Sequence, residues 1–159
     1  MAVHLPQAQA HGADHTLRVT LAYRGDELEV KRVERVRMLA PGQAVREPPG
    51  EHGAGFWFEI RDGKGKLLYH RVIHQPNRAD REVFSPDPDQ TVRREPKSSE
   101  PEGEFTLLVP DIPEGAEFVV HASPAREPGA PAKERLKHDF DRLRRGEGGE
   151  KRSDRKKGK

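Results

Sequence analysis

Residues 55–74 (GFWFEIRDGKGKLLYHRVIH) constrain the fold more than any other stretch, because they predict two strands joined by a tight turn. Phe56, Phe58 and Ile60 recur at every second position, which is the period of a strand with one buried face. The polar connector 62–66 (DGKGK) contains two glycines, and a loop of this length between two apolar runs is typical of a β-hairpin. We therefore expect an antiparallel β protein built around this hairpin.

The rest of the chain continues this pattern of short apolar runs separated by turns that are rich in Gly and Pro. Predicted strands cover residues 16–23, 28–39, 56–61, 67–74, 81–84, 104–109 and 117–122. About seven short strands with no intervening helix are typical of a small sandwich. The sequence therefore predicts a mainly β fold, a single antiparallel immunoglobulin-like or fibronectin-III-like β-sandwich over residues 16–122, preceded by a flexible arm at 1–15.

The second predicted strand, at residues 28–39, has a helix as its rival, since Val30, Val33 and Val36 recur at a spacing of three. Three β-branched valines and the turn that precedes them favour a strand. The apolar pattern slips by one residue between Val30 and Val33, which predicts a β-bulge or a change of sheet.

The length and composition of the chain bound its class. A chain of 159 residues has room for one domain, and its 32% of hydrophobic residues indicates a modest core with polar appendages. The absence of cysteine excludes disulfides, thiolate metal sites and cysteine nucleophiles. No apolar run is long enough to span a bilayer, and the first residues lack the basic and apolar regions of a signal peptide. We expect a cytoplasmic protein, with export as the alternative.

The segment after the predicted sandwich is expected to contain a helix. A proline-rich linker at 123–131 precedes residues 132–145, in which three apolar residues recur at i, i+4 and i+7: Leu136, Phe140 and Leu143. They form one thin apolar stripe, and such a helix needs to dock on the sandwich or on a partner. Residues 146–159 are basic and of low complexity, and we expect a disordered tail.

Trp57 is the only tryptophan, and it lies on the strand face opposite to Phe56 and Phe58. If those phenylalanines form the core, Trp57 faces outward, where the helix or a partner can cover it. If the register is reversed, Trp57 is the core aromatic residue. We take the outward face and the helix stripe as the predicted contact surface for another protein, and its residues are Trp57, Leu136, Phe140 and Leu143.

A second candidate surface is electrostatic. Nine Lys and Arg residues occur from Arg142 onward, whereas residues 1–130 hold more acidic than basic groups. These cations would neutralise phosphates on a nucleic acid or charges on another acidic surface. The predicted electrostatic residues are Arg142, Arg144, Arg145, Lys151, Arg152, Arg155, Lys156 and Lys157. Three acidic residues interrupt the run and no aromatic residue there offers stacking, so a solubilising tail is the favoured interpretation.

The sequence contains no recognisable catalytic or cofactor-binding motif. It has no H-E-x-x-H, no G-x-S-x-G and no G-x-x-x-x-G-K-[ST] pattern. His70 and His74 lie four residues apart in a predicted strand, which places their Cβ atoms about 13 Å apart, too far to share one metal ion. We expect no enzyme activity, no cofactor and no metal site.

The run 56–74 consists of a strand (FWFEIRD), a tight turn and a second strand (KLLYHRV), and a further strand and a Pro-rich stretch follow it. This arrangement resembles the immunoglobulin-like β-sandwich at the N-terminus of bacterial M64-type (IgA-cleaving) metallopeptidases over residues 16–122. The peptidase zinc motif is absent, so the resemblance implies an accessory or interaction module and carries over no catalytic residue. We expect a non-catalytic module that binds another protein or belongs to a larger assembly, with binding of nucleic acid through the tail as the alternative.

Overall fold

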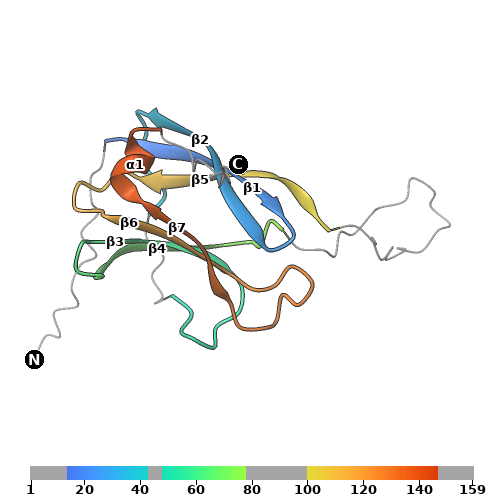
Figure 1. The fold of residues 1–159 in the computed structure, drawn as a ribbon. Coiled ribbons are helices and arrows are strands. Elements are labelled where there is room, and N and C mark those ends of the chain that lie inside the picture. Colours follow the sequence, from blue (N-terminus) through green and yellow to red (C-terminus); the bar gives the residue numbers. More distant parts are fainter. Residues whose placement is uncertain (1–13, 43–47, 78–99, 147–159) are drawn as a thin grey trace, which may run out of the picture.

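Two antiparallel sheets lie face to face and form the body of the protein (Figure 1). The computed structural model describes residues 14–42, 48–77 and 100–146, and both sheets lie within these ranges. The prediction of a mainly β, antiparallel sandwich is confirmed. The strand predicted at 81–84 lies outside the described residues, as do most of the arm 1–15 and the tail after Gly146.

The smaller sheet has the strand order β2-β1-β5, and the larger sheet has the order β4-β3-β6-β7. The smaller sheet contains β1 (Thr16–Arg24), β2 (Glu27–Val36) and β5 (Glu102–Pro110). The larger sheet contains β3 (Phe56–Arg61), β4 (Leu67–Ile73), β6 (Glu117–Ala122) and β7 (Lys133–Asp139), and β7 leads into the short helix α1 (Phe140–Arg144). The hairpin expected from the sequence is therefore the β3–β4 pair.

Apolar side chains at alternate strand positions meet between the two sheets and form the core. Phe58 contacts Phe118 on the neighbouring strand, with 5.7 Å between the ring centroids. Other fully buried residues are Leu17, Val19, Leu21, Phe56, Ile60, Val109, Ile112, Val120, Phe140 and Leu143. Since each large apolar side chain contributes about 1.5–3 kcal/mol when fully buried, this layer is the main source of stability.

Strand β2 contains the β-bulge that the slipped pattern predicted. Thr20 of β1 pairs with Arg32, whereas the next residue, Leu21, pairs with Val30. Lys31 is therefore an extra residue in β2. The bulge explains how apolar side chains on both sides of it reach the core, and it confirms the strand over the rival helix.

The helix predicted over residues 132–145 is wrong in its first half. Residues Lys133–Asp139 form strand β7, which pairs with β6 so that Leu136 lies opposite Val120. Leu136 still packs against the core, but it does so from a strand. Hydrogen bonds with the otherwise unpaired side of β6 outweigh the weak helical preference of this segment, which has only one thin apolar stripe to support a helix.

The helix α1 begins only at Phe140. The side chain of Asp139 caps it by accepting a hydrogen bond from the backbone N–H of Arg142 at 3.0 Å. The sandwich therefore continues to Asp139, beyond the boundary predicted at residue 122. The segment 123–131 connects two neighbouring strands of the same sheet.

Candidate functional site

Trp57 lies on the outer face of the larger sheet, since Phe56 and Phe58 face the core, and the reversed register is thereby excluded. The indole is nevertheless buried, with only 3% of the residue exposed. Its ring stacks on the imidazole of His121, the residue opposite it on β6, with 5.0 Å between the centroids and an interplanar angle of 16°. A side chain covered in this way offers almost no surface to a partner.

Glu59 is the centre of a buried polar cluster on the same face. Its carboxylate accepts hydrogen bonds from Trp57 Nε1 at 3.1 Å and from Arg61 Nε at 2.7 Å, and the residue is 4% exposed. His121 Nε2 lies 3.6 Å from Glu59 Oε1, within ion-pair distance but too far for a hydrogen bond. Burial would raise the pKa of this carboxyl, but the contact with His121 and the two donors lower it from 4.5 to about 2.

The Glu59 cluster is suited to holding the sheet together rather than to catalysis. A general base needs access to a substrate and a pKa near the working pH. The carboxylate of Glu59 has a pKa of about 2, and it is engaged by neighbours on its own sheet.

The apolar stripe predicted to contact a partner is not exposed. Phe140 and Leu143 have no exposed surface, and Leu136 packs against the core from β7. The backbone N–H of Phe140 also donates to the carbonyl of Ala116 at 2.9 Å, which ties α1 to the turn before β6. The structure does not bring these residues and Trp57 together on one surface.

Arg144, predicted as a cation of the basic tail, is part of the fold. Its Nε donates to Asp111 Oδ1 at 2.8 Å, its Nη1 to Asp141 Oδ1 at 2.6 Å, and its Nη2 to the carbonyl of Ile112. The guanidinium also lies over the ring of Phe140, 4.4 Å from the centroid. These contacts leave Arg144 little freedom to bind an external anion.

The other predicted electrostatic residues fall into two groups. Arg142 lies in α1 and Arg145 directly follows it, and each makes interactions of its own. The remaining residues lie outside the described part of the chain: Lys151, Arg152, Arg155, Lys156 and Lys157.

Shifted pKa values elsewhere have local structural causes. Backbone hydrogen bonds from Lys66 and Lys64 lower the pKa of Asp62 in the β3–β4 turn, and burial raises the pKa of Tyr69. Among the residues that the structure describes, no three His, Cys, Asp or Glu side chains are grouped so that they could hold a metal ion. No helix in that part of the chain is long and apolar enough to cross a membrane.

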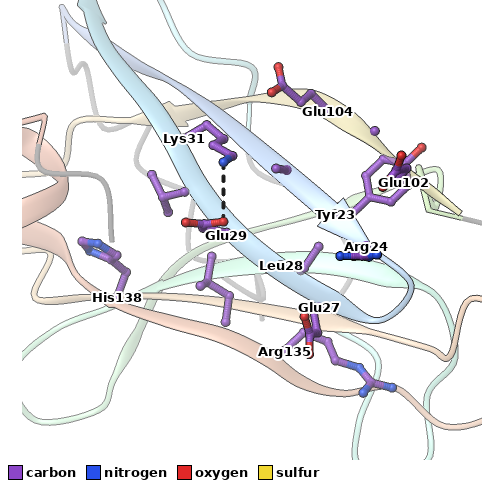
Figure 2. A pocket seen from close by; sticks show the side chains of 14 residues that line it. Tyr23, Arg24, Glu27, Leu28, Glu29, Lys31, Glu102, Glu104, Arg135 and His138 are labelled. Carbon is purple, nitrogen blue, oxygen red and sulfur yellow. Dashed lines mark ion pairs between the residues drawn. The ribbon is translucent and has the colours of Figure 1, made fainter. Parts of the chain in front are cut away.

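A hollow of about 850 Å³ lies where the β1–β2 hairpin, the start of β5 and strand β7 meet (Figure 2). It is lined by residues 22–24 of β1, 27–31 of β2, 102–104 of β5, and three residues of β7: Arg135, Leu136 and His138. In the described sheets β2 and β7 are both edge strands. The hollow is therefore bounded on two sides by strands that have a neighbour on one side only.

Ala22 lies between two glutamates on the outer face of the smaller sheet, since its neighbour Leu21 faces the core. It pairs with Glu29 on β2 and with Glu104 on β5, and residues paired in this way point to the same face of the sheet. Lys31 forms an ion pair with Glu29 at 3.6 Å (Figure 2). No ion pair of Glu104 occurs among the described residues.

A second row of charges lies beside the first. Arg24 pairs with Glu27 on β2 and with Glu102 on β5, so that one cation stands between two carboxylates. Neither carboxylate comes within ion-pair distance of a cation in the described part of the chain. Arg135 of β7, by contrast, faces Asp26 at 3.9 Å and donates to the carbonyl of Ala122. The lining of the hollow thus holds four glutamates against three cations, Arg24, Lys31 and Arg135, an excess of one negative charge when His138 is left out.

The floor of the hollow is partly apolar. Leu28 of β2 and Leu136 of β7 are half-buried and pack against the edge of the core. Tyr23 lies close to β5, since a Cβ atom added to Gly103 would stand 2.7 Å from the Tyr23 hydroxyl oxygen. Gly103 therefore allows the tyrosine ring to lie against the strand at this point.

Comparison of the chain with protein-family models, with curated proteins and with solved structures finds no match. The resemblance to the N-terminal domain of M64-type metallopeptidases therefore receives no support from a family model. The geometry supports the coarser description, a two-sheet antiparallel β-sandwich that is compatible with an immunoglobulin-like fold.

The sequence predictions did not include this hollow, although the chain carries a signal for part of it. Two Glu-x-Glu motifs, at 27–29 and 102–104, lie in predicted or adjoining strand segments. The strand period of two places both carboxylates of such a motif on one face. The pairing of both motifs with β1, which brings the four carboxylates together, depends on the register of three strands.

Proposed function

We propose that this chain is a non-catalytic interaction domain that binds an extended, lysine- or arginine-rich segment of a partner protein in the hollow between β2 and β7. The single observation that carries the proposal is the union of an edge strand, a half-buried apolar floor and a rim of glutamates in one place. Each of these properties fits one part of a basic extended peptide.

The charge of the rim favours a basic ligand. Three of its glutamates have no ion pair within the described residues, and they are Glu27, Glu102 and Glu104. Each exposed ion pair with a bound lysine or arginine contributes about 0.2–1 kcal/mol, and the summed negative charge accelerates association. The same glutamates would repel the phosphates of a nucleic acid.

The edge strand and the floor favour an extended conformation of the bound segment. An extended peptide can pair with the free backbone groups of an edge strand, while its side chains enter neighbouring pockets. Leu28 lies between Glu27 and Glu29 on β2 and therefore points to the opposite side of the strand, where it packs against the core. Alternate side chains of an extended segment beside β2 would thus meet the glutamates on one side and the apolar floor, with Leu28 and Leu136, on the other. Leu136 thus remains a proposed contact residue, although it belongs to a strand and not to a helix.

The environment of the Glu59 carboxylate supports a non-catalytic role for the outer face of the larger sheet. Its neighbours lower the pKa of Glu59 to about 2, and the residue is buried and accepts hydrogen bonds from Arg61 and Trp57. The immunoglobulin-like assignment, and an accessory role beside a peptidase, belong to this proposal and rest on the strand pattern alone. Binding of nucleic acid through residues 151–157 remains the alternative.

The test is a titration followed by NMR on a full-length variant in which the six Lys and Arg residues of 147–159 are replaced by Gln. This variant removes the chain's own basic segment as a competitor. A synthetic lysine-rich peptide should shift the backbone signals of Ala22, Glu29 and Glu104, and the shifts should weaken as salt is added.

The matched variants change two glutamates inside or outside the hollow. Replacing Glu102 and Glu104 by Gln should weaken peptide binding about 10-fold, which corresponds to about 1.4 kcal/mol. Replacing the exposed Glu114 and Glu127 by Gln should leave binding unchanged. Equal effects of the two pairs, or shifts confined to another surface, would refute the proposal. Binding of a single-stranded oligonucleotide by the wild-type tail, with no peptide binding, would favour the alternative.

A further inference from the structure

We propose that the hollow is occupied in the free protein by the chain's own basic segment, residues 147–159, which a partner must displace. The inference rests on the proposed function, because it takes the same hollow as the binding site. Three observations support it: the place where the chain leaves α1, the distance to the hollow, and the charges on both sides.

The chain leaves α1 beside strand β2, the edge strand that borders the hollow. Helix α1 packs next to β2 (Figure 1). Gly146 follows the helix with a φ of +73°, and its N–H donates to the carbonyl of Leu143 at 3.0 Å. A Cβ atom added to Gly146 would lie 3.7 Å from the carbonyl oxygen of Val33. The positive φ, which glycine adopts without strain, thus turns the chain at the edge of β2.

The segment is long enough to reach the hollow. Val33 and Glu29 are four residues apart on β2, which corresponds to about 13 Å at about 3.3 Å per residue. Lys151 follows Gly146 by five residues, and an extended chain of that length spans about 17 Å. The cations from Lys151 onward can therefore stand beside Glu29 and the other glutamates of the rim.

The charges of the two parts are complementary. Residues 147–159 contain six Lys and Arg residues against three Asp and Glu residues. The lining of the hollow contains four glutamates against three cations, Arg24, Lys31 and Arg135, and in the described part of the chain only Glu29 forms an ion pair with one of these cations. Because both parts belong to one chain, their effective concentration is in the millimolar range, so even a weak contact is populated.

The consequence is a built-in competitor. A basic partner segment that binds the hollow must first displace residues 147–159, which lowers its apparent affinity. A partner that also binds the released basic segment through acidic groups would recover this loss. The device would favour partners that carry both kinds of charge over any basic peptide.

The experiment uses the absence of cysteine from the chain. A Ser153→Cys substitution gives a single site for a nitroxide spin label within the basic segment. At low salt the label should broaden the backbone NMR signals of Ala22, Glu29 and Glu104, and it should leave those of Leu67 and Val72 on β4 unchanged. At about 0.5 M salt, where the Debye length is only a few ångströms, the broadening should disappear.

Two matched variants test the charges. Replacing Glu102 and Glu104 by Gln should reduce the broadening, whereas replacing Glu114 and Glu127 should not. The lysine-rich peptide should bind the wild-type chain about 10-fold more weakly than it binds the variant with the neutral segment, as expected for a competitor at millimolar effective concentration. Unbroadened signals of Ala22, Glu29 and Glu104 at low salt would overturn the inference.

A mixed sample separates contacts within one chain from contacts between two copies. It contains spin-labelled chains without isotope and isotope-labelled chains without the spin label. Broadening in this sample would show that a second copy supplies the segment, and it would overturn the inference as stated. Peptide binding by the neutral variant without broadening in the wild-type chain would leave the proposed function intact and refute only this inference.

Discussion

Arg61 donates a hydrogen bond from Nε to Glu59 Oε2 at 2.7 Å, and the two residues lie two positions apart on the outer face of β3. Trp57 stands two positions further along the same face and donates to the other carboxylate oxygen. One row of side chains on a single strand therefore contains a cation, an anion and an indole donor that satisfy one another. The row makes the outer face of the larger sheet polar in chemistry yet closed to solvent at its centre.

Replacing Glu59 by Gln should destabilise the protein by about 1–3 kcal/mol. The amide is neutral, so it weakens the bonds from Arg61 and Trp57, and hydrogen bonds to a charged group contribute more than neutral ones. Urea unfolding followed by the fluorescence of the single tryptophan measures the free energy of unfolding. The control is Glu114→Gln in the exposed turn before β6, which should change stability by less than about 0.5 kcal/mol. Equal effects of the two substitutions would show that the cluster adds nothing.

Lowering the pH should reduce the free energy of unfolding of the wild-type protein more than that of the Glu59→Gln variant. The pKa of Glu59 is lowered from 4.5 to about 2 in the folded protein, so the unfolded chain binds this proton first as the pH falls. The contribution of Glu59 is therefore fully present above about pH 4.5 and is lost as the pH falls towards about 2. Urea unfolding of both proteins between about pH 5 and pH 2 should show the difference in stability shrinking towards zero. A difference that stays constant over this range would contradict the assigned pKa.

The strands of the sandwich could be predicted because apolar and polar residues alternate within each short segment, and this pattern does not depend on distant residues. The β3–β4 hairpin and the bulge in β2 at Lys31 both follow from side-chain periods of neighbouring residues. Strand β7 could not be predicted in this way. Leu136 and Phe140 are four residues apart, which fits a helical stripe, and the partner that makes the segment a strand is β6, more than ten residues earlier.

The burial of Trp57 could not be predicted from the sequence either. The alternation of residues placed it on the outer face, and the outer face of an antiparallel sheet is usually exposed to solvent. Its burial depends on His121, which stacks on it from another strand, and on Glu59, which accepts its N–H. The hollow between β2 and β7 likewise arises only when two sheets are brought together, so its floor has no signature in either strand alone.

Replacing Gly115 by Ala should destabilise the protein by about 1–3 kcal/mol through overpacking. A Cβ atom at this position would lie 2.7 Å from Phe140 Cδ1 and 3.0 Å from Ile60 Cγ2, both in the core. The strain should therefore act on the docking of α1 against the larger sheet. The control is Gly129→Ala, since a Cβ atom at Gly129 meets nothing within 4 Å. Urea unfolding should show a loss for the first variant alone, and a neutral Gly115→Ala would mean that the helix has room to shift.

Replacing Arg144 by Gln should lower the free energy of unfolding by about 1–3 kcal/mol. The same substitution in a basic tail that makes no contact with the fold would leave the free energy of unfolding unchanged. The substitution removes the hydrogen bonds to Asp111 and to the carbonyl of Ile112, and the cation over the ring of Phe140. Among the described residues, the carboxylate of Asp111 would keep only its bond from Arg35, whose side chain is 57% exposed.

The control for Arg144 is Arg126→Gln, which removes the same charge from an exposed loop position. It should leave the free energy of unfolding within about 0.5 kcal/mol of the wild-type value. Thermal unfolding adds a second readout, because a loss of about 1 kcal/mol lowers the melting temperature of a domain of this size by roughly 2–6 °C. If both variants unfold like the wild type, Arg144 acts as a surface cation after all. If only Arg144→Gln unfolds earlier, Arg144 stabilises the fold and does not belong to the basic tail.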